Sequence, residues 1–225
     1  MRTAFGGELA AFEIMWPDFF DFGVEVSRAK GSPFGRPYPL YALVEQTTLN
    51  PEDCGHRFQE ILSAAGDAGT ILDAVVALSS SEREALWEIR ECTSEFPARL
   101  APINFDVSVQ IADMGRFVSE CREMLRSLAP NHRSFFFGHL GDSNLHVTVD
   151  ANSTPGVPRD AVENALYALV GRYRGSISAE HGIGVLKREH LHHSRTAGEL
   201  RAMWAIKKAL DPKGILNPGK LLPEE

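Results

Sequence analysis

Two histidines that bracket a turn constrain this chain more than any other feature. They lie in the segment Gly138-His139-Leu140-Gly141-Asp142-Ser143-Asn144-Leu145-His146. Aromatic and β-branched residues flank the segment on both sides, which predicts two strands joined by a turn over residues 141–144. If the hairpin pairs Gly141 with Asn144, then His139 lies opposite His146. Their Cβ atoms would be roughly 4.5 to 5.5 Å apart on one face, so the sequence brings two imidazole rings together.

Two neighbouring imidazoles can share a metal ion when a third ligand joins them. The best candidate lies in residues 176–184, where Glu180 directly precedes His181. One of these two can bind a metal while the other, which points elsewhere, acts as a base. Two histidines and one glutamate leave a coordination position open, as in catalytic zinc sites. The alternative is that His139 and His146 are core or turn residues hydrogen-bonded to the backbone.

Hydrophobic patterning predicts short strands and helices in alternation. The strands are expected over residues 8–15, 38–46, 71–78 and 103–110, besides the two strands of the hairpin. The helices are expected from residue 17, over 51–65 with Asn50 as cap, over 82–94 behind a capping box at 79–81, and over 112–128, 159–173, 185–192 and 197–210. This order fits an α+β fold with a mostly antiparallel sheet and helices on one face, or equally parallel α/β units. We expect a single domain over residues 1–225.

Composition excludes several classes of function. A net charge of -7 argues against nucleic acid or an anionic membrane surface as a partner. Cys54, Cys92 and Cys121 are widely spaced and odd in number, which indicates reduced thiols rather than disulfides or a sulfur metal site. No stretch has the layout of a signal peptide or approaches the roughly 20 apolar residues of a membrane span. We therefore expect a cytoplasmic protein, with attachment to a membrane through a partner left open.

Three motifs in a fixed order make the chain similar to a known family. They are the histidine segment above, then Ser178-Ala179-Glu180-His181-Gly182-Ile183-Gly184 with Lys187, then Leu210-Asp211-Pro212-Lys213-Gly214-Ile215-Leu216-Asn217-Pro218-Gly219-Lys220. The chain resembles the C-terminal domain of the FAD-linked oxidases, which include D-lactate dehydrogenase, the D subunit of glycolate oxidase and D-2-hydroxyglutarate dehydrogenase. The likeness runs along the whole chain and favours the antiparallel, ferredoxin-like version of the fold.

The resemblance implies that His139, His146 and Glu180 bind a divalent metal, with zinc as the expected ion, and that His181 is the catalytic base. A 2-hydroxy acid would be oxidised to the 2-oxo acid, with its hydroxyl proton taken by His181 and a hydride passed to FAD. The family's flavin sits on a separate N-terminal domain whose glycine-rich segment has no counterpart here. The chain is thus expected to be the substrate-binding half of a flavoenzyme. The alternative is a non-enzymatic metal-binding or subunit-contact domain.

Further residues are implied to contact the substrate or the flavin half. Arg90 and Ser94, one helical turn apart, would face the substrate's carboxylate. Without the resemblance, Arg90 would be expected to pair with Glu91 or Glu95 on a solvated face. The residues implied on the flavin side are Asn144, Lys187, Asn217 and Lys220, which otherwise have plain roles in a turn, at a helix end and in a solvated tail.

Three positions depart from the family pattern. Asn104 stands where D-2-hydroxyglutarate dehydrogenase has a lysine for the distal carboxylate, and Thr148 stands where it has an asparagine. A neutral amide cannot replace an ammonium as the counter-charge of a carboxylate. With Asn104 at this position, a monocarboxylic 2-hydroxy acid is at least as plausible a substrate as one with a second carboxylate. Ser143 replaces a glycine of the hairpin turn, where a positive φ would be mildly strained.

Overall fold

The structure is a computed structural model that describes residues 2–28, 31–47 and 51–223, without the side chains of residues 2 and 51–54. The predicted cap Asn50 and the Cys54 side chain lie outside the described residues. The chain forms two compact units. The first comprises Met1–Arg99 and Phe137–Asp142, and the second comprises Leu100–Phe136 and Ser143–Glu225.

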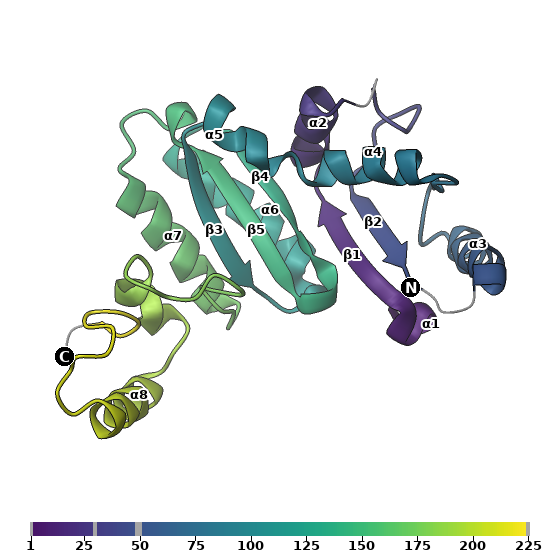
Figure 1. Ribbon diagram of the computed structural model, residues 1–225. Coiled ribbons are helices and arrows are strands. Elements are labelled where there is room, and N and C mark those ends of the chain that lie inside the picture. Colours follow the sequence, from purple (N-terminus) through teal and green to yellow (C-terminus); the bar gives the residue numbers. More distant parts are fainter. Residues whose placement is uncertain (1, 29–30, 48–50, 224–225) are drawn as a thin grey trace. The chain divides into compact units, whose positions relative to one another are not determined.

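The first unit has the strand order β2-β1-β4, with β1 at its centre (Figure 1). β1 (Leu9–Met15) is antiparallel to β2 (Tyr41–Gln46) and to the end of β4 (Ser134–His139). Its other elements are α1 (Arg2–Phe5), η1 (Gly6–Glu8), α2 (Pro17–Val26), α3 (Pro51–Asp67), α4 (Ser80–Arg90), η2 (Cys92–Glu95) and α5 (Phe96–Arg99). Aromatic rings fill its core, where Phe19 stacks on Phe137 and Phe20 on Tyr41, with ring centroids 4.1 and 3.6 Å apart. β1 is therefore covered by strands at both edges, and α2 contributes the packed aromatic face.

Helices α2 and α4 approach each other closely at Gly23, which lies inside α2. A Cβ at this position would lie 2.4 Å from the backbone oxygen of Ile89. Inside a helix, glycine to alanine is normally stabilising by roughly 0.5 to 1 kcal/mol. Here we expect Gly23→Ala to destabilise the fold by roughly 1 to 3 kcal/mol, because backbone must move to admit the methyl group. Thermal unfolding would measure the change.

A matched control for this prediction is Gly115→Ala at an exposed position of α6 (Ile111–Leu128), where a Cβ meets nothing within 4 Å. That variant should show the ordinary helix-propensity gain and unfold at a slightly higher temperature. If both alanine variants raised the unfolding temperature alike, the close packing of α2 on α4 would be wrong.

The second unit has the strand order β4-β5-β3. β3 (Pro102–Ser108) is antiparallel to β5 (Asn144–Asp150), and Asp106 lies opposite His146. Helices α6 (Ile111–Leu128) and α7 (Arg159–Arg172) cover one face of these strands (Figure 1). Phe105 on that face packs against Tyr167 of α7, with ring centroids 5.4 Å apart. The remaining elements are η3 (Leu140–Asp142), which leads from β4 into β5, η4 (Ala151–Ser153), η5 (Arg188–His193) and α8 (Ala197–Leu210).

The opposite face of β3 and β5 carries polar side chains in alternation with the apolar ones. These are Asn104, Asp106 and Ser108 on β3 and Asn144, His146 and Thr148 on β5. Three of them, Asp106, Asn144 and Thr148, are nonetheless buried. Polar groups that leave water need partners, so this face is built for specific interactions rather than for solvation.

Most predicted elements are confirmed, including the hairpin and the mostly antiparallel pairing. The predicted strand over residues 71–78 is wrong, because no strand forms there and Leu72 and Leu78 are 66% and 83% exposed. Two backbone N–H groups of this segment are hydrogen-bonded to side chains instead of to a neighbouring strand. The N–H of Ala74 donates to the Asp73 carboxylate, and the N–H of Leu78 donates to the Glu82 carboxylate.

Two predicted helices are shorter than expected. The helix over 82–94 ends at Arg90 and continues only as the 3₁₀ segment η2, although its predicted cap is present, with Ser79 accepting from the backbone N–H of Glu82. The helix over 185–192 is replaced by a 3₁₀ segment that starts at Arg188. Gly182 and Gly184 have φ angles of 77° and 56°, so the backbone before this segment follows a non-helical path.

The two cysteines whose side chains are described, Cys92 and Cys121, are buried free thiols. Burial raises the pKa of each thiol to about 12, although a nearby arginine opposes the shift in both. Thiols with such a pKa are protonated at neutral pH and are poor nucleophiles. None of the helices in the described part of the chain combines the length and the hydropathy that a membrane span requires.

Candidate metal and substrate site

In the first unit, Glu13 of β1 joins two of the predicted site residues. Its Oε2 accepts from Nε and Nη2 of Arg90 at 2.8 and 2.7 Å. Nδ1 of His139 lies 2.9 Å from Oε1 and 2.8 Å from Oε2 of the same carboxylate. Glu13 and Arg90 are both buried, and the guanidinium also lies 4.9 Å from the ring centre of Phe137. The partner of Arg90 is thus Glu13, rather than Glu91 or Glu95.

Electrostatics keep Glu13 ionised. Burial by itself raises the pKa of Glu13, but the hydrogen bond from His139 and the charge of Arg90 outweigh it, so the pKa lies below the ordinary value. A cavity of about 380 Å³ lies beside the carboxylate and His139, and Gly141 and Asp142 also line it. The first unit therefore presents a histidine, held by a buried carboxylate, at the wall of a polar cavity.

In the second unit, Asp106 of β3 holds the loop that carries Glu180 and His181. Its Oδ2 accepts from the backbone N–H groups of these two residues at 2.9 and 2.8 Å. Ser178 Oγ lies 3.4 Å and Lys187 Nζ 3.7 Å from the same oxygen. Burial raises the pKa of Asp106, but the two N–H groups and Lys187 lower it below its ordinary value. One buried carboxylate therefore fixes the backbone of the predicted ligand and base.

This loop lies beside His146 of β5. Asp106, His146 and His181 each offer a ligand atom, and these atoms lie within 4.8 Å of one another. The ligand atoms of His146 and Glu180 are within the same distance. The His146 and His181 rings are stacked with centroids 5.8 Å apart. The second unit thus brings together three of the predicted site residues and adds Asp106.

These residues fit a zinc-class ion, which prefers imidazole nitrogen and carboxylate oxygen as ligands. Two buried oxygens, Asp106 Oδ1 and Asn144 Oδ1, find no hydrogen-bond donor among the described residues. Both belong to residues beside His146, since Asp106 is its cross-strand partner and the Asn144 amide nitrogen lies 3.5 Å from its Nε2. Orphaned acceptors are costly when buried, so a cation or a water molecule at this face would satisfy them.

The hairpin turn that links His139 to His146 has the expected positive φ at Ser143, where the family pattern has a glycine. Ser143 has a φ of 60°, in the left-handed region where a side chain is strained. The turn is a short 3₁₀ segment, η3, and it supplies Gly141 and Asp142 to the cavity wall. The serine thus keeps the backbone path that glycine would take more easily.

The other predicted substrate residues occupy different settings. Thr148 Oγ1 donates to Asn104 Oδ1 at 2.8 Å across the β3–β5 pair, so the two side chains form an uncharged hydrogen-bonded pair on the polar face. Ser94 is exposed in η2, beyond the end of α4. Because η2 is not α-helical, Ser94 does not continue the helix face of Arg90.

The predicted flavin-side residues divide into two groups. Asn144 and Lys187 belong to the polar face, where Lys187 Nζ contacts Ser178 Oγ at 3.1 Å and the Asp106 carbonyl oxygen at 3.4 Å. Asn217 and Lys220 are exposed in the C-terminal tail. This tail returns to the glycine-rich loop, because the N–H of Leu221 donates to the carbonyl of Gly184 at 2.9 Å.

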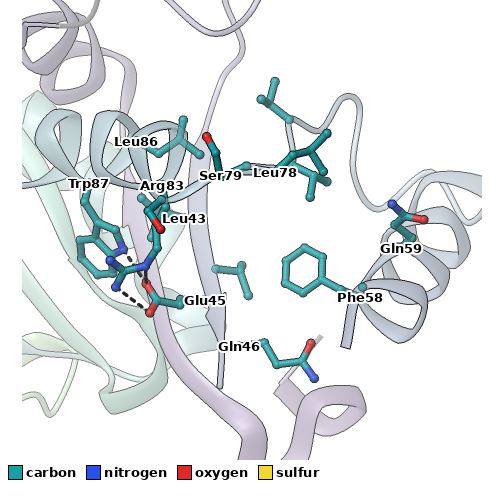
Figure 2. Close-up of a pocket in the computed structure, with 16 residues that line it drawn as sticks. Leu43, Glu45, Gln46, Phe58, Gln59, Leu78, Ser79, Arg83, Leu86 and Trp87 are labelled. Carbon is teal, nitrogen blue, oxygen red and sulfur yellow. Dashed lines mark hydrogen bonds and ion pairs between the residues drawn. The ribbon is translucent and has the colours of Figure 1, made fainter. Parts of the chain in front are cut away.

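A second cavity, of about 620 Å³, lies elsewhere in the first unit, between β2, α3 and α4 (Figure 2). Leu43, Phe58 and Leu86 give it an apolar lining, and Glu45 is held by Arg83 and Trp87. None of the predicted site residues lines it. The candidate metal and substrate residues therefore lie around Glu13 and His139 in the first unit and on the polar face of β3 and β5 in the second.

A sequence profile described as "FAD linked oxidases, C-terminal domain" matches residues 1–221. The chain belongs to this family. It is 37% identical over 225 residues to the D-2-hydroxyglutarate dehydrogenase of Xanthomonas citri pv. viticola, a match that covers 95% of this chain and 46% of that protein. It is 31% identical over 219 residues to the mitochondrial D-2-hydroxyglutarate dehydrogenase of Arabidopsis thaliana, covering 97% and 39%. The chain thus spans less than half the length of these relatives.

A solved structure shares the fold of this FAD-linked oxidase domain. The 4-ethylphenol oxidase from Gulosibacter chungangensis, in its isoeugenol complex, matches with a TM-score of 0.56 at 16% identity, covering 95% of this chain and 48% of that one. The predicted family and the α+β fold of its C-terminal domain are confirmed.

Two residues at the site, Glu13 and Asp106, were not predicted. Glu13 has a signal in the sequence, since it is the one charge inside the apolar strand Leu9-Ala10-Ala11-Phe12-Glu13-Ile14-Met15. Asp106 has a weaker one, because a carboxylate on the polar side of an alternating strand ordinarily faces solvent. Its register opposite His146 shows its role, and that register comes from the structure.

Proposed function

We propose that this domain is the substrate-binding half of a flavin-dependent oxidoreductase that oxidises a D-2-hydroxy acid to the 2-oxo acid. Membership of the FAD-linked oxidases and likeness to D-2-hydroxyglutarate dehydrogenases support this proposal. The observation that carries it is the Glu180–His181 loop, which two hydrogen bonds to Asp106 fix beside His146. A metal ligand and a base on adjacent residues suit acid–base chemistry at a hydroxyl group.

In this proposal His139, His146 and Glu180 hold a divalent ion of the zinc class, and His181 takes the proton of the substrate hydroxyl. The ion, when bound, supplies Lewis acidity that lowers the pKa of that hydroxyl. A flavin would supply the hydride acceptor and would be held mainly by a partner domain, in the same chain or as a separate subunit. Asp106 keeps the backbone of Glu180 and His181 in place while the proton moves.

We further propose that Arg90 attracts the substrate's carboxylate. Its Nε and Nη2 are bound to Glu13, so the carboxylate would be met by the Nη1 side of the guanidinium. A guanidinium N–H that meets the carboxylate would fix the orientation of the acid.

The uncharged pair of Asn104 and Thr148 affects whether a substrate with a second, distal carboxylate would be favoured. Neither residue can act as counter-charge to a second carboxylate. We therefore propose that the substrate is bound through one carboxylate at the Arg90 end, which D-lactate, glycolate and D-2-hydroxyglutarate all offer. A distal carboxylate would gain no ion pair from this pair of residues.

The purified 225-residue chain should bind about one zinc-class ion, and His139→Ala with His146→Ala should abolish this binding. Two neutral imidazoles are the nitrogen ligands of the proposed set, so the remaining carboxylate cannot hold the ion alone. Elemental analysis after dialysis against a weak chelator would measure the metal content. The matched control is His192→Ala with His193→Ala, a histidine pair on η5 with ring centres 4.0 Å apart. Equal metal content in the wild type and in the His139→Ala, His146→Ala variant would contradict the proposed metal site.

A further inference from the structure

Glu13 is a buried charge in the middle of three strands. It lies opposite Leu43 of β2 on one side and opposite His139 of β4 on the other, and it is 5% exposed. Burying a carboxylate is costly unless charge and hydrogen bonds compensate it. Arg90 and His139 provide both, through contacts of 2.7 to 2.9 Å. The first unit thus retains a charged residue where an apolar one would pack at less cost.

The contact between Glu13 and His139 determines which nitrogen of the imidazole carries the proton. An ionised carboxylate has acceptors and no donors, so Nδ1 of His139 must donate. In the neutral ring, Nε2 then carries the lone pair. Histidines that bind metals in proteins almost always donate their other ring N–H to a carboxylate or carbonyl, which fixes the tautomer and makes the ligand nitrogen more basic.

We propose that Glu13 is a positioning residue of the metal site, which holds His139 in the tautomer protonated at Nδ1 so that Nε2 can bind the ion. The proposal rests on the proposed metal site, and it adds that Glu13 couples this ligand to Arg90. Because both contacts use one carboxylate, the side chain that would orient the metal ligand also anchors the arginine that would meet the substrate.

The chain offers a matched control for this role. Glu45 of β2 also binds an arginine through Nε and Nη, since Arg83 lies 3.1 and 2.8 Å from its oxygens. Among the described residues, its hydrogen-bond partners are Arg83 and Trp87 and no histidine. Replacing either glutamate by glutamine removes one strand carboxylate and leaves one arginine without its counter-charge. Only the change at Glu13 should affect metal binding.

The first measurement is the dissociation constant for Zn²⁺ by competition with a chelator, on the full 225-residue chain. Glu13→Gln should weaken binding roughly 10- to 100-fold, the usual effect of removing such a partner of a ligand histidine. Glu45→Gln should stay within about 2-fold of the wild type. The double variant Glu13→Gln with Arg90→Gln leaves neither buried charge without its partner. It should bind Zn²⁺ as weakly as Glu13→Gln. Circular dichroism of the metal-free proteins would check that each variant folds.

The second measurement does not depend on a metal. Long-range ¹H–¹⁵N NMR spectra of the metal-free wild type at about pH 8, with His139 assigned by comparison with His139→Ala, should show the ring protonated at Nδ1. A neutral ring protonated at Nε2 would overturn the inference, and so would a Glu13→Gln variant that binds zinc as tightly as the wild type. A wild type that binds no zinc while showing the Nδ1 tautomer would instead overturn the proposed metal site and leave Glu13 as an orienting residue of His139.

Discussion

A complete enzyme that carries His181→Asn should keep its metal and lose roughly 10² to 10⁴ in turnover, the usual contribution of a general base. In the proposed site the two functions belong to different side chains, with Glu180 as the metal ligand and His181 as the base. Asp106 holds the backbone of both residues. Asparagine keeps a polar side chain of similar size but cannot take a proton at neutral pH. Turnover with D-2-hydroxy acids and metal content should be measured on the same preparation.

Two variants give this prediction its controls. Glu180→Gln should lose metal together with activity, and His192→Asn, at an exposed position of η5, should change neither. If His181→Asn lost the metal as well, His181 would be a ligand rather than a base. The ligand set would then be Asp106, His146 and His181, which the structure also brings within 4.8 Å of one another.

Local patterns were enough to predict most of the fold. Proline at the first position of α2 and the serine cap of α4 act within one helical turn, so the sequence nearby decides them. The segment over residues 71–78 has the composition of a strand. A strand also needs a neighbour with open backbone groups, and this requirement is not visible in the segment itself.

The same distinction applies to the site. His139, His146, Glu180 and His181 lie in short motifs, so their sequence spacing was informative. Glu13 and Asp106 act across large sequence separations, on residues 126 and 75 positions away. Their positions depend on strand register, which brings Glu13 opposite His139 and Asp106 opposite His146. Because a shift of one residue would turn each carboxylate to the other face, only the folded sheet reveals these contacts.

Arg90 shows how a correct residue can have an incomplete interpretation. The sequence placed it on a helix beside Glu91 and Glu95, which are near in the chain. The structure buries it against a strand glutamate and an aromatic ring instead. Helical spacing predicts neighbours on the same helix, whereas a buried arginine takes its partner from another element.

The 225 residues by themselves should show no 2-hydroxy acid dehydrogenase activity, even with added FAD. The site offers imidazoles, carboxylates and a candidate zinc-class ion, and none of these can accept two electrons from a substrate. His181 can remove the hydroxyl proton, but the α-hydrogen must leave with its electron pair to a flavin held in a defined position. Adding the cognate FAD-binding domain, as a fusion or a second chain, should restore oxidation, with electrons passed to an artificial dye.

The test compares dye reduction by the 225 residues, by the joined protein and by a joined His181→Asn variant, with D-lactate and D-2-hydroxyglutarate as substrates. Only the joined wild type should turn over at an appreciable rate. Since Asn104 and Thr148 provide no counter-charge for a second carboxylate, this pair gives D-2-hydroxyglutarate no advantage over D-lactate. If the 225 residues reduced the dye with either acid about as fast as the joined protein, the domain would hold a complete redox site, and its assignment as the substrate-binding half would be wrong.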